Sequence, residues 1–141
     1  WWGGLAFINY LNSINYSGSN QWRLPTNNAI IGYNGTAGNE LGQLFYSELG
    51  GAAGSNIPNT STFNNEHAYQ YWLSTEYAPS PDNAWNFITD YGYQVYNDKR
   101  NPFYAWAVSP GQVAAVPVPG AVWLMGSGLL GLLGLKRRQL S

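Results

Sequence analysis

Apolar positions recur along the chain at two different periods, and the period changes near residue 69. Residues 2–14 carry apolar side chains at intervals of three and four, which predicts a helix with a wide buried face. Residues 39–49 repeat this pattern and predict a second helix. Asn39 is expected to cap that helix, and Gly50 and Gly51 are expected to end it.

Beyond residue 69, aromatic and β-branched residues dominate four short runs. These runs are predicted strands at 69–77, 84–89, 92–96 and 103–108. Clusters of Pro, Asn, Asp and Gly separate them, and this spacing predicts an antiparallel meander. Helices followed by strands predict one α+β domain over residues 1–111. Four tryptophans are expected in its core: Trp22, Trp72, Trp85 and Trp106.

The chain ends in a pattern that is typical of a membrane anchor. Residues 112–119 form a linker rich in Pro, Val and Ala, and residues 120–141 contain an uncharged apolar run at 121–135. That run would be about 22 Å long as a helix, somewhat short of the roughly 30 Å hydrocarbon core. Lys136, Arg137 and Arg138 follow it and favour a cytoplasmic C-terminus. The alternative, a buried helix of a soluble domain, leaves the missing polar face unexplained. We therefore predict a transmembrane helix, with the domain on the far side of the membrane.

The same segment resembles a family of sorting signals. Val116, Pro117, Val118, Pro119 and Gly120 precede the apolar run, and the basic residues follow it. This order is similar to a PEP-CTERM tail, in particular to its VPxPA variant. The resemblance implies export by the Sec route in a Gram-negative bacterium, an inner-membrane precursor, and an exosortase that cuts near the proline motif. Since export needs an N-terminal signal and the chain opens on Trp1, we expect the beginning of the protein to be missing.

Charge and composition exclude several kinds of partner and site. Charged residues make up 9% of the chain and aromatic residues 16%, so the body is expected to fold on an aromatic core. Residues 1–116 hold all seven acidic residues and three of the six basic ones, a net charge of −4. This balance argues against nucleic acid as a partner. The absence of cysteine excludes disulfides and thiolate chemistry. Arg23 and Lys99 are expected to form internal ion pairs, with Glu76 as a candidate partner.

A second resemblance covers nearly the whole body. It rests on Trp22-Arg23-Leu24-Pro25-Thr26, residues 40–45, residues 71–76, Ala84-Trp85-Asn86-Phe87, residues 92–94, Lys99 and residues 105–108, which occur in this order. Together they are similar to the Lcl C-terminal domain family. The resemblance implies a C-type-lectin-like fold, with two helices packed on a twisted antiparallel sheet with long loops.

Residues capable of catalysis or metal binding are few. His67 is the single histidine, and a lone loop histidine is more often solvated or an anchor than a base. Glu76, Asp82, Asp90 and Asp98 lie at strand ends or turns and could converge in a hydrolase, but solvated turn residues are the simpler interpretation. Asp82, Asp90 and Asp98 are also the candidate calcium ligands, because calcium prefers oxygen donors in loops. We expect no enzyme activity and no resident cofactor.

Tyrosines near the predicted turns are the candidate ligand-binding residues. Exposed aromatic rings and Asn-rich loops suit sugar rings and their hydroxyl groups. The candidates are Tyr77, Tyr91, Tyr93 and Tyr96, with Tyr104 as a further one. The sequence thus favours an exported surface or extracellular-matrix protein with a domain that binds extracellular polysaccharide. A structural matrix component without a ligand and a carboxylate-dependent hydrolase are the alternatives.

Overall fold

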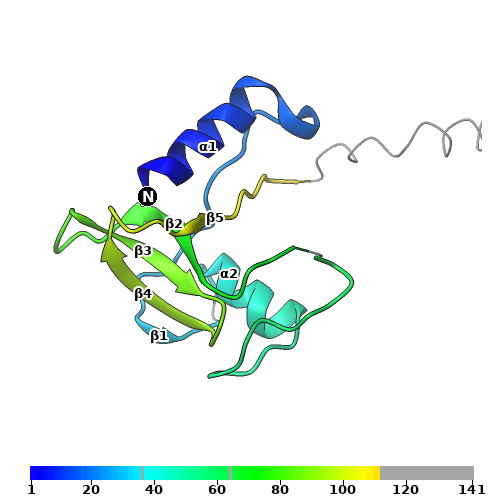
Figure 1. Cartoon of the computed structure of the whole chain (residues 1–141), viewed down its shortest axis with the longest axis vertical. Coiled ribbons are helices and arrows are strands. Elements are labelled where there is room, and N and C mark those ends of the chain that lie inside the picture. The colour runs from blue at the N-terminus through cyan, green and yellow to red at the C-terminus, as the bar shows by residue number, and fades with distance from the viewer. Residues whose placement is uncertain (36, 64, 112–141) are drawn as a thin grey trace, which may run out of the picture.

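The described part of the chain has a mixed α+β architecture of two helices and a five-stranded sheet (Figure 1). The computed structural model describes residues 1–35, 37–63 and 65–111. In chain order the elements are α1 (Trp2–Ser13), a 3₁₀ turn (Tyr16–Gly18), β1 (Gly32–Tyr33), α2 (Glu40–Gln43), a π-helical turn (Leu44–Glu48), β2 (Gln70–Glu76), β3 (Asn83–Ile88), β4 (Tyr93–Asp98) and β5 (Tyr104–Ala105). The strand order is β1-β4-β3-β2-β5.

The predicted meander is confirmed for three of the four runs. β2 pairs with β3, and β3 pairs with β4, both antiparallel. Trp72 lies opposite Asn86, which lies opposite Val95, so these three side chains share one face of the sheet. The fourth run, expected as an antiparallel strand over 103–108, contributes only the two residues of β5 and runs parallel to β2.

A crossing loop explains the direction of β5. β4 ends with Asp98 opposite Asn83, whereas β5 begins with Tyr104 opposite Tyr71, near the start of β2. Residues 99–103 must therefore run back along the sheet, and they do so with Phe103 packed on Trp72 at 4.8 Å between ring centroids. The return makes β5 parallel to β2, as any crossover connection does.

The opposite edge of the sheet is formed by β1, where the sequence pattern predicts no strand. Gly32 and Tyr33 pair with Gln94 and Tyr93 of β4. The Gln94 side chain is fully buried and donates from Nε2 to the Ile30 carbonyl at 2.8 Å. This hydrogen bond holds the polar, glycine-bearing segment of β1 against β4. The segment lacks the alternating apolar residues that would predict a strand.

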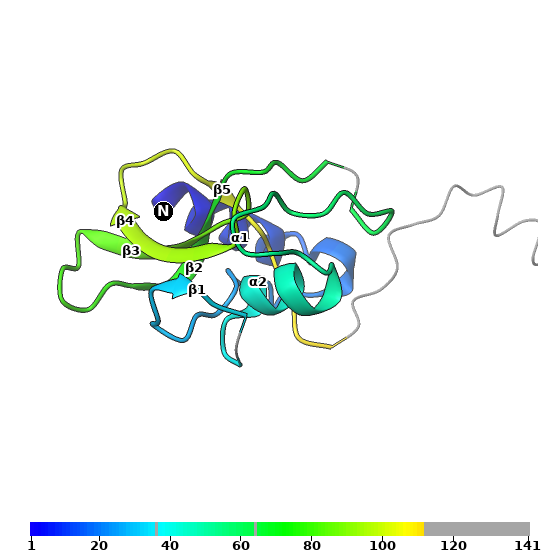
Figure 2. The same ribbon diagram turned by 90° about the horizontal axis from the view of Figure 1, so that it is seen from below.

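The two helices pack on opposite faces of the sheet: α1 lies above it and α2 below it in Figure 1, and Figure 2, seen from below, has α1 behind the sheet. On the α1 face the buried residues are Ile8, Leu24, Trp72 and Ala84. On the α2 face they are Leu41, Phe45, Ile57, Tyr71, Leu73, Trp85 and Phe87. Trp72 and Trp85 are buried as expected, whereas Trp22 and Trp106 are only partly buried. Within the described ranges, no helix is long and apolar enough to span a bilayer. The apolar run at 121–135 lies outside these ranges.

The second predicted helix exists, but its last turn is wider than an α-helix. Asn39 caps it as expected, because its Oδ1 accepts the Gly42 amide at 3.0 Å. After Gln43 the chain adopts a π-helical turn, in which the Leu49 amide donates to the Leu44 carbonyl at 2.9 Å. The wider turn brings the consecutive rings of Phe45 and Tyr46 toward the sheet, where Phe45 contacts Phe87 and the Tyr46 hydroxyl donates to the Gly92 carbonyl.

Candidate functional site

A cavity of about 620 Å³ opens between α1, β5 and the segment at residues 65–67. Its walls are mostly aromatic, with polar side chains only on the side of that segment. The lining residues are Phe7, Leu11, Tyr16, Trp22, Phe63, Asn65, Glu66, His67, Tyr71, Tyr104, Ala105, Trp106 and Ala107. We call this cavity the aromatic groove.

Rings from β2 and from the end of the domain form the floor of the groove. Tyr71 lies 5.3 Å from Trp106 and 5.5 Å from Tyr104, measured between centroids. Phe63 meets Trp106 edge to face at 5.0 Å. Burial raises the pKa of Tyr71, so its phenol stays neutral. The floor is therefore an uncharged, interlocked set of rings, which suits an apolar ligand face.

His67 stands on the rim, and its backbone is fixed at both ends. The Tyr71 hydroxyl accepts from the His67 amide and donates to the His67 carbonyl, each at 2.9 Å. Thr89 Oγ1 donates to the same carbonyl at 3.1 Å. The imidazole ring stacks on Tyr104, with 5.0 Å between centroids and 10° between planes. His67 is thus an exposed loop residue, as expected, with its backbone anchored and its ring packed against an aromatic wall.

The Trp22 wall of the groove is held by Asn12 of α1. The Asn12 side chain accepts from the Trp22 amide at 2.7 Å and donates to the Trp22 carbonyl at 2.9 Å. The Trp22 indole donates to the Tyr16 carbonyl at 2.9 Å, and the two rings lie 5.8 Å apart. These bonds fix the Trp22 ring before any ligand arrives.

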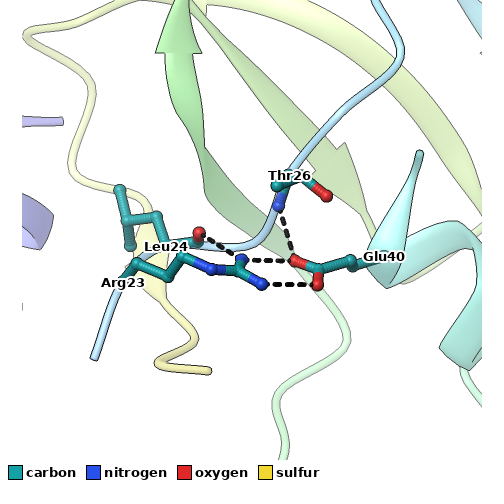
Figure 3. A network of polar contacts seen from close by, with 4 residues as sticks. All are labelled: Arg23, Leu24, Thr26 and Glu40. Atoms are coloured by element: carbon teal, nitrogen blue, oxygen red, sulfur yellow. Dashed lines mark hydrogen bonds and ion pairs between the residues drawn. The ribbon is translucent and has the colours of Figure 1, made fainter. Parts of the chain in front are cut away.

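An ion pair fixes the segment that follows Trp22 (Figure 3). Arg23 binds both carboxylate oxygens of Glu40, at 2.6 and 2.8 Å, and the Thr26 amide donates to Glu40 Oε2 at 2.7 Å. The guanidinium also donates to the Leu24 carbonyl at 3.3 Å. The Arg23 side chain, followed by the Thr26 amide, lowers the pKa of Glu40 to about 2.

The expected partner of Arg23 was therefore wrong, while that of Lys99 is confirmed. Glu76 binds Lys99, with 2.6 Å between Oε1 and Nζ. The Lys99 side chain is only 6% exposed, and its ammonium also lies 4.6 Å from the centroid of Trp1.

Four of the five tyrosines nominated from the sequence fall into two groups, neither of which lines the groove. Tyr77 and Tyr96 stack face to face at 3.7 Å beside Trp85. Tyr91 and Tyr93 lie 5.9 Å apart, at the other end of the β3–β4 hairpin. Tyr104 is the one nominated tyrosine within the groove. Trp22 and Trp106, which the sequence analysis assigned to the core, are partly buried and line the groove instead.

The three candidate calcium ligands are not brought together. Asp82 precedes β3 and lies near Asp98, which ends β4, and both line one small cavity. Asp90 lies in the turn at the far end of the same hairpin. Asp98 binds Arg100, with 2.5 Å between Oδ2 and Nη2, and this contact lowers its pKa. Among residues 1–35, 37–63 and 65–111, no group of three or more acidic, His or Cys side chains could hold a metal ion.

The sorting motif and the basic stop lie outside the described residues, so residues 116–120 and 136–138 stay predictions from the sequence.

Fold and groove together define a small α+β domain with an aromatic-lined cavity between α1 and β5. The chain matches the Lcl C-terminal domain over residues 1–109, and it belongs to that family. Membership indicates an extracellular or surface protein. No curated protein and no solved structure matches the chain.

Proposed function

We propose that this chain is an exported bacterial surface or matrix protein whose domain binds a neutral polysaccharide in the aromatic groove. The groove itself carries the proposal: its ring-lined walls suit the C–H faces of sugar rings, and Asn65, Glu66 and His67 at the rim suit their hydroxyl groups. The domain's negative net charge favours neutral over anionic polymers.

The delivery part of the proposal rests on the C-terminal sequence. The linker at 112–119 and the segment at 120–141 resemble a PEP-CTERM tail of the VPxPA type, which exosortase would process at the inner membrane. The domain at 1–111 would then reach the outer surface or the extracellular matrix. Its helices, irregular sheet and long loops are consistent with the C-type-lectin-like architecture that we propose for it.

A binding role is favoured over a hydrolytic one by the groove's charges. Glycosidases use a pair of carboxyl groups about 5–9 Å apart on either side of the bond that they cleave. Among the described lining residues, Glu66 is the single acidic one, and Glu76, Asp82, Asp90 and Asp98 lie elsewhere. We therefore propose no enzyme activity and no resident cofactor.

The groove is tested with Tyr104→Ala and a matched control, Tyr10→Ala. Both side chains are exposed, at 43% and 60%, so neither change should unfold the domain, but only Tyr104 lines the groove. On a glycan array and by titration calorimetry, Tyr104→Ala should weaken binding about tenfold, the value of one lost stacking contact. Tyr10→Ala should leave affinity unchanged, with and without chelator.

Three other outcomes would contradict this proposal. No saccharide binding, with concentration-dependent assembly, would favour a structural matrix component. Equal weakening by both variants would place the ligand elsewhere. Turnover that is lost in Glu66→Gln or Glu76→Gln would favour a hydrolase.

A further inference from the structure

We propose that the domain carries a second site for a neutral saccharide at the opposite edge of the sheet, which makes it able to cross-link polymer chains. The site consists of the rings of Tyr33, Tyr91 and Tyr93, which we call the tyrosine platform. This inference rests on the proposed function, because it assigns the same class of ligand to a second surface.

The platform is a set of rings that hold one another and leave faces open. Tyr33 of β1 lies opposite Tyr93 of β4, and their rings meet edge to face at 5.1 Å and 85°. Tyr91 leans on Tyr93 at 5.9 Å and 45°. Tyr33 is 57% exposed, so its ring is available although it is packed along one edge. An edge-to-face pair presents two ring faces at a fixed angle, which suits a rigid ring ligand.

The backbone beneath the platform is fixed from two sides. The Gly92 carbonyl accepts the Tyr46 hydroxyl at 2.6 Å, and the Gly92 amide donates to the Ile88 carbonyl at 2.8 Å. On the β1 side, Gln94 holds the Ile30 carbonyl. A platform that is ordered before binding loses little conformational entropy when a ligand arrives.

The polar surroundings select the ligand. Asp90 Oδ1 is buried and has no hydrogen-bond partner, next to Tyr91 in the chain. Burial, followed by the Asp90 carboxylate, raises the pKa of the Tyr91 phenol. Neutral phenols beside the exposed Ile30 and Ile31 fit a ring with apolar faces and hydroxyl groups. An anionic sugar would be repelled by Asp90.

A second copy of the chain fits this edge less well. β1 has only two residues, too short a ladder for a stable strand addition between copies. A saccharide needs no ladder, since stacking and a few hydrogen bonds hold it. The experiment therefore has to distinguish saccharide binding at the platform from dimer formation through the platform.

The distance between the two sites is the reason why we expect the domain to cross-link polymer chains. The aromatic groove adjoins β5 and β2, and the platform adjoins β1 and β4, at opposite ends of the strand order. Four strand spacings separate these edges, about 19 Å. One sugar residue cannot fill both sites at that distance, so two chains, or two distant parts of one chain, are joined.

The test uses the full chain in nonionic detergent, with residues 1–111 measured beside it. The probes are neutral hexasaccharides of glucose, galactose, mannose and N-acetylglucosamine and the matching polymers. Calorimetry should give two hexasaccharides per chain for the wild type and one for Tyr33→Ala or Tyr104→Ala. Only the wild type should precipitate polymer, and Tyr33→Phe, which keeps the ring, should restore both properties.

The outcomes separate the two proposals. One hexasaccharide per wild-type chain, unaffected by Tyr33→Ala, overturns the platform and leaves the groove standing. Loss of all binding in Tyr33→Ala alone overturns the groove and the cross-linking. Absence of any binding overturns both, and a dimer that Tyr33→Ala dissociates shows that the platform is an interface between copies.

Discussion

At the scale of single residues, Glu40 links local chemistry to the acid stability of the domain. Its carboxylate binds Arg23 and the Thr26 amide, and its pKa is about 2 instead of 4.5. Because the folded pKa is lowered, the stabilisation is complete above about pH 4.5 and is lost as the pH falls toward 2. Solvent screening of this half-exposed pair limits its value to about 1 kcal/mol.

Glu40→Gln should therefore lower the free energy of unfolding by about 1 kcal/mol at pH 7, and the difference should shrink between pH 4.5 and 2. Urea titrations across this range measure it. Asp98→Asn serves as the control, since its pair with Arg100 is more exposed and should matter less. A constant difference from pH 7 to pH 2 would show that the charge of Glu40 is not responsible.

For Asn86 we predict the opposite effect, a gain in stability on replacement, because its polar side-chain atoms have no hydrogen-bond partners. The residue is fully buried in β3, and neither Oδ1 nor Nδ2 has a hydrogen-bond partner. Replacing an unpaired amide by an apolar group of similar size removes a desolvation cost. Asn86→Leu should therefore raise stability by about 1 kcal/mol, measured as a higher Tm and urea midpoint.

Asn39→Leu serves as the comparison for Asn86→Leu and should lower the stability. Asn39 is equally buried, but its side chain accepts the Gly42 amide and donates to the Asn34 carbonyl. Its loss should cost about 2 kcal/mol. If both variants lose the same stability, Asn86 is held by a contact such as a buried water.

At the scale of elements, the β3–β4 turn depends on one glycine. Gly92 has φ +75°, and a Cβ there would lie 2.5 Å from the Tyr46 hydroxyl and 2.7 Å from the Phe45 ring. Gly92→Ala should lower stability by about 2 kcal/mol or more, because backbone strain and a clash add together. Gly54→Ala has a similar φ of +81° with open space around it, so it should cost only about 1 kcal/mol. Equal losses in chemical denaturation would show that the packing against Tyr46 is unimportant.

Elements with a strong local pattern were predictable, and those that depend on distant partners were not. The helix at 2–14 and the cap at Asn39 follow from spacing and side-chain chemistry within a few residues, and both are confirmed. β1 has no such pattern, since it exists because Gln94 binds its loop from β4. The direction of β5 depends on where the crossing loop at 99–103 leads, and periodicity carries no information about that.

The groove escaped sequence analysis for a similar reason. Its walls come from α1, β2, β5 and the segment near residue 65, and no local run contains more than a few of its residues. The sequence nominated tyrosines near the predicted turns, and one of them, Tyr104, lines the groove. It could not separate rings that stack on each other, such as Tyr77 and Tyr96, from rings that leave a face for a ligand.

At the scale of the whole molecule, the expected delivery can be tested by fractionation in a Gram-negative host. Full-length protein, expressed behind an export signal, should remain with the membrane in alkaline carbonate when exosortase is absent. Deleting residues 120–141 should move it to the soluble periplasmic fraction, because the predicted anchor is gone. The control variant Lys136→Gln/Arg137→Gln/Arg138→Gln keeps the apolar run and should be retained less completely. Full-length protein found in the cytosol would contradict the delivery proposal.

The last residues of the domain act as a latch on the first ones. Val108 exchanges backbone hydrogen bonds with Arg23, the Ser109 hydroxyl meets that of Ser19 at 2.7 Å, and β5 joins β2. Neither the aromatic wall at Trp106 nor the pairing of residue 23 can form until the chain is complete to about this point. These closing contacts therefore form only once residues 104–109 have been synthesised, after every other helix and strand of the described domain.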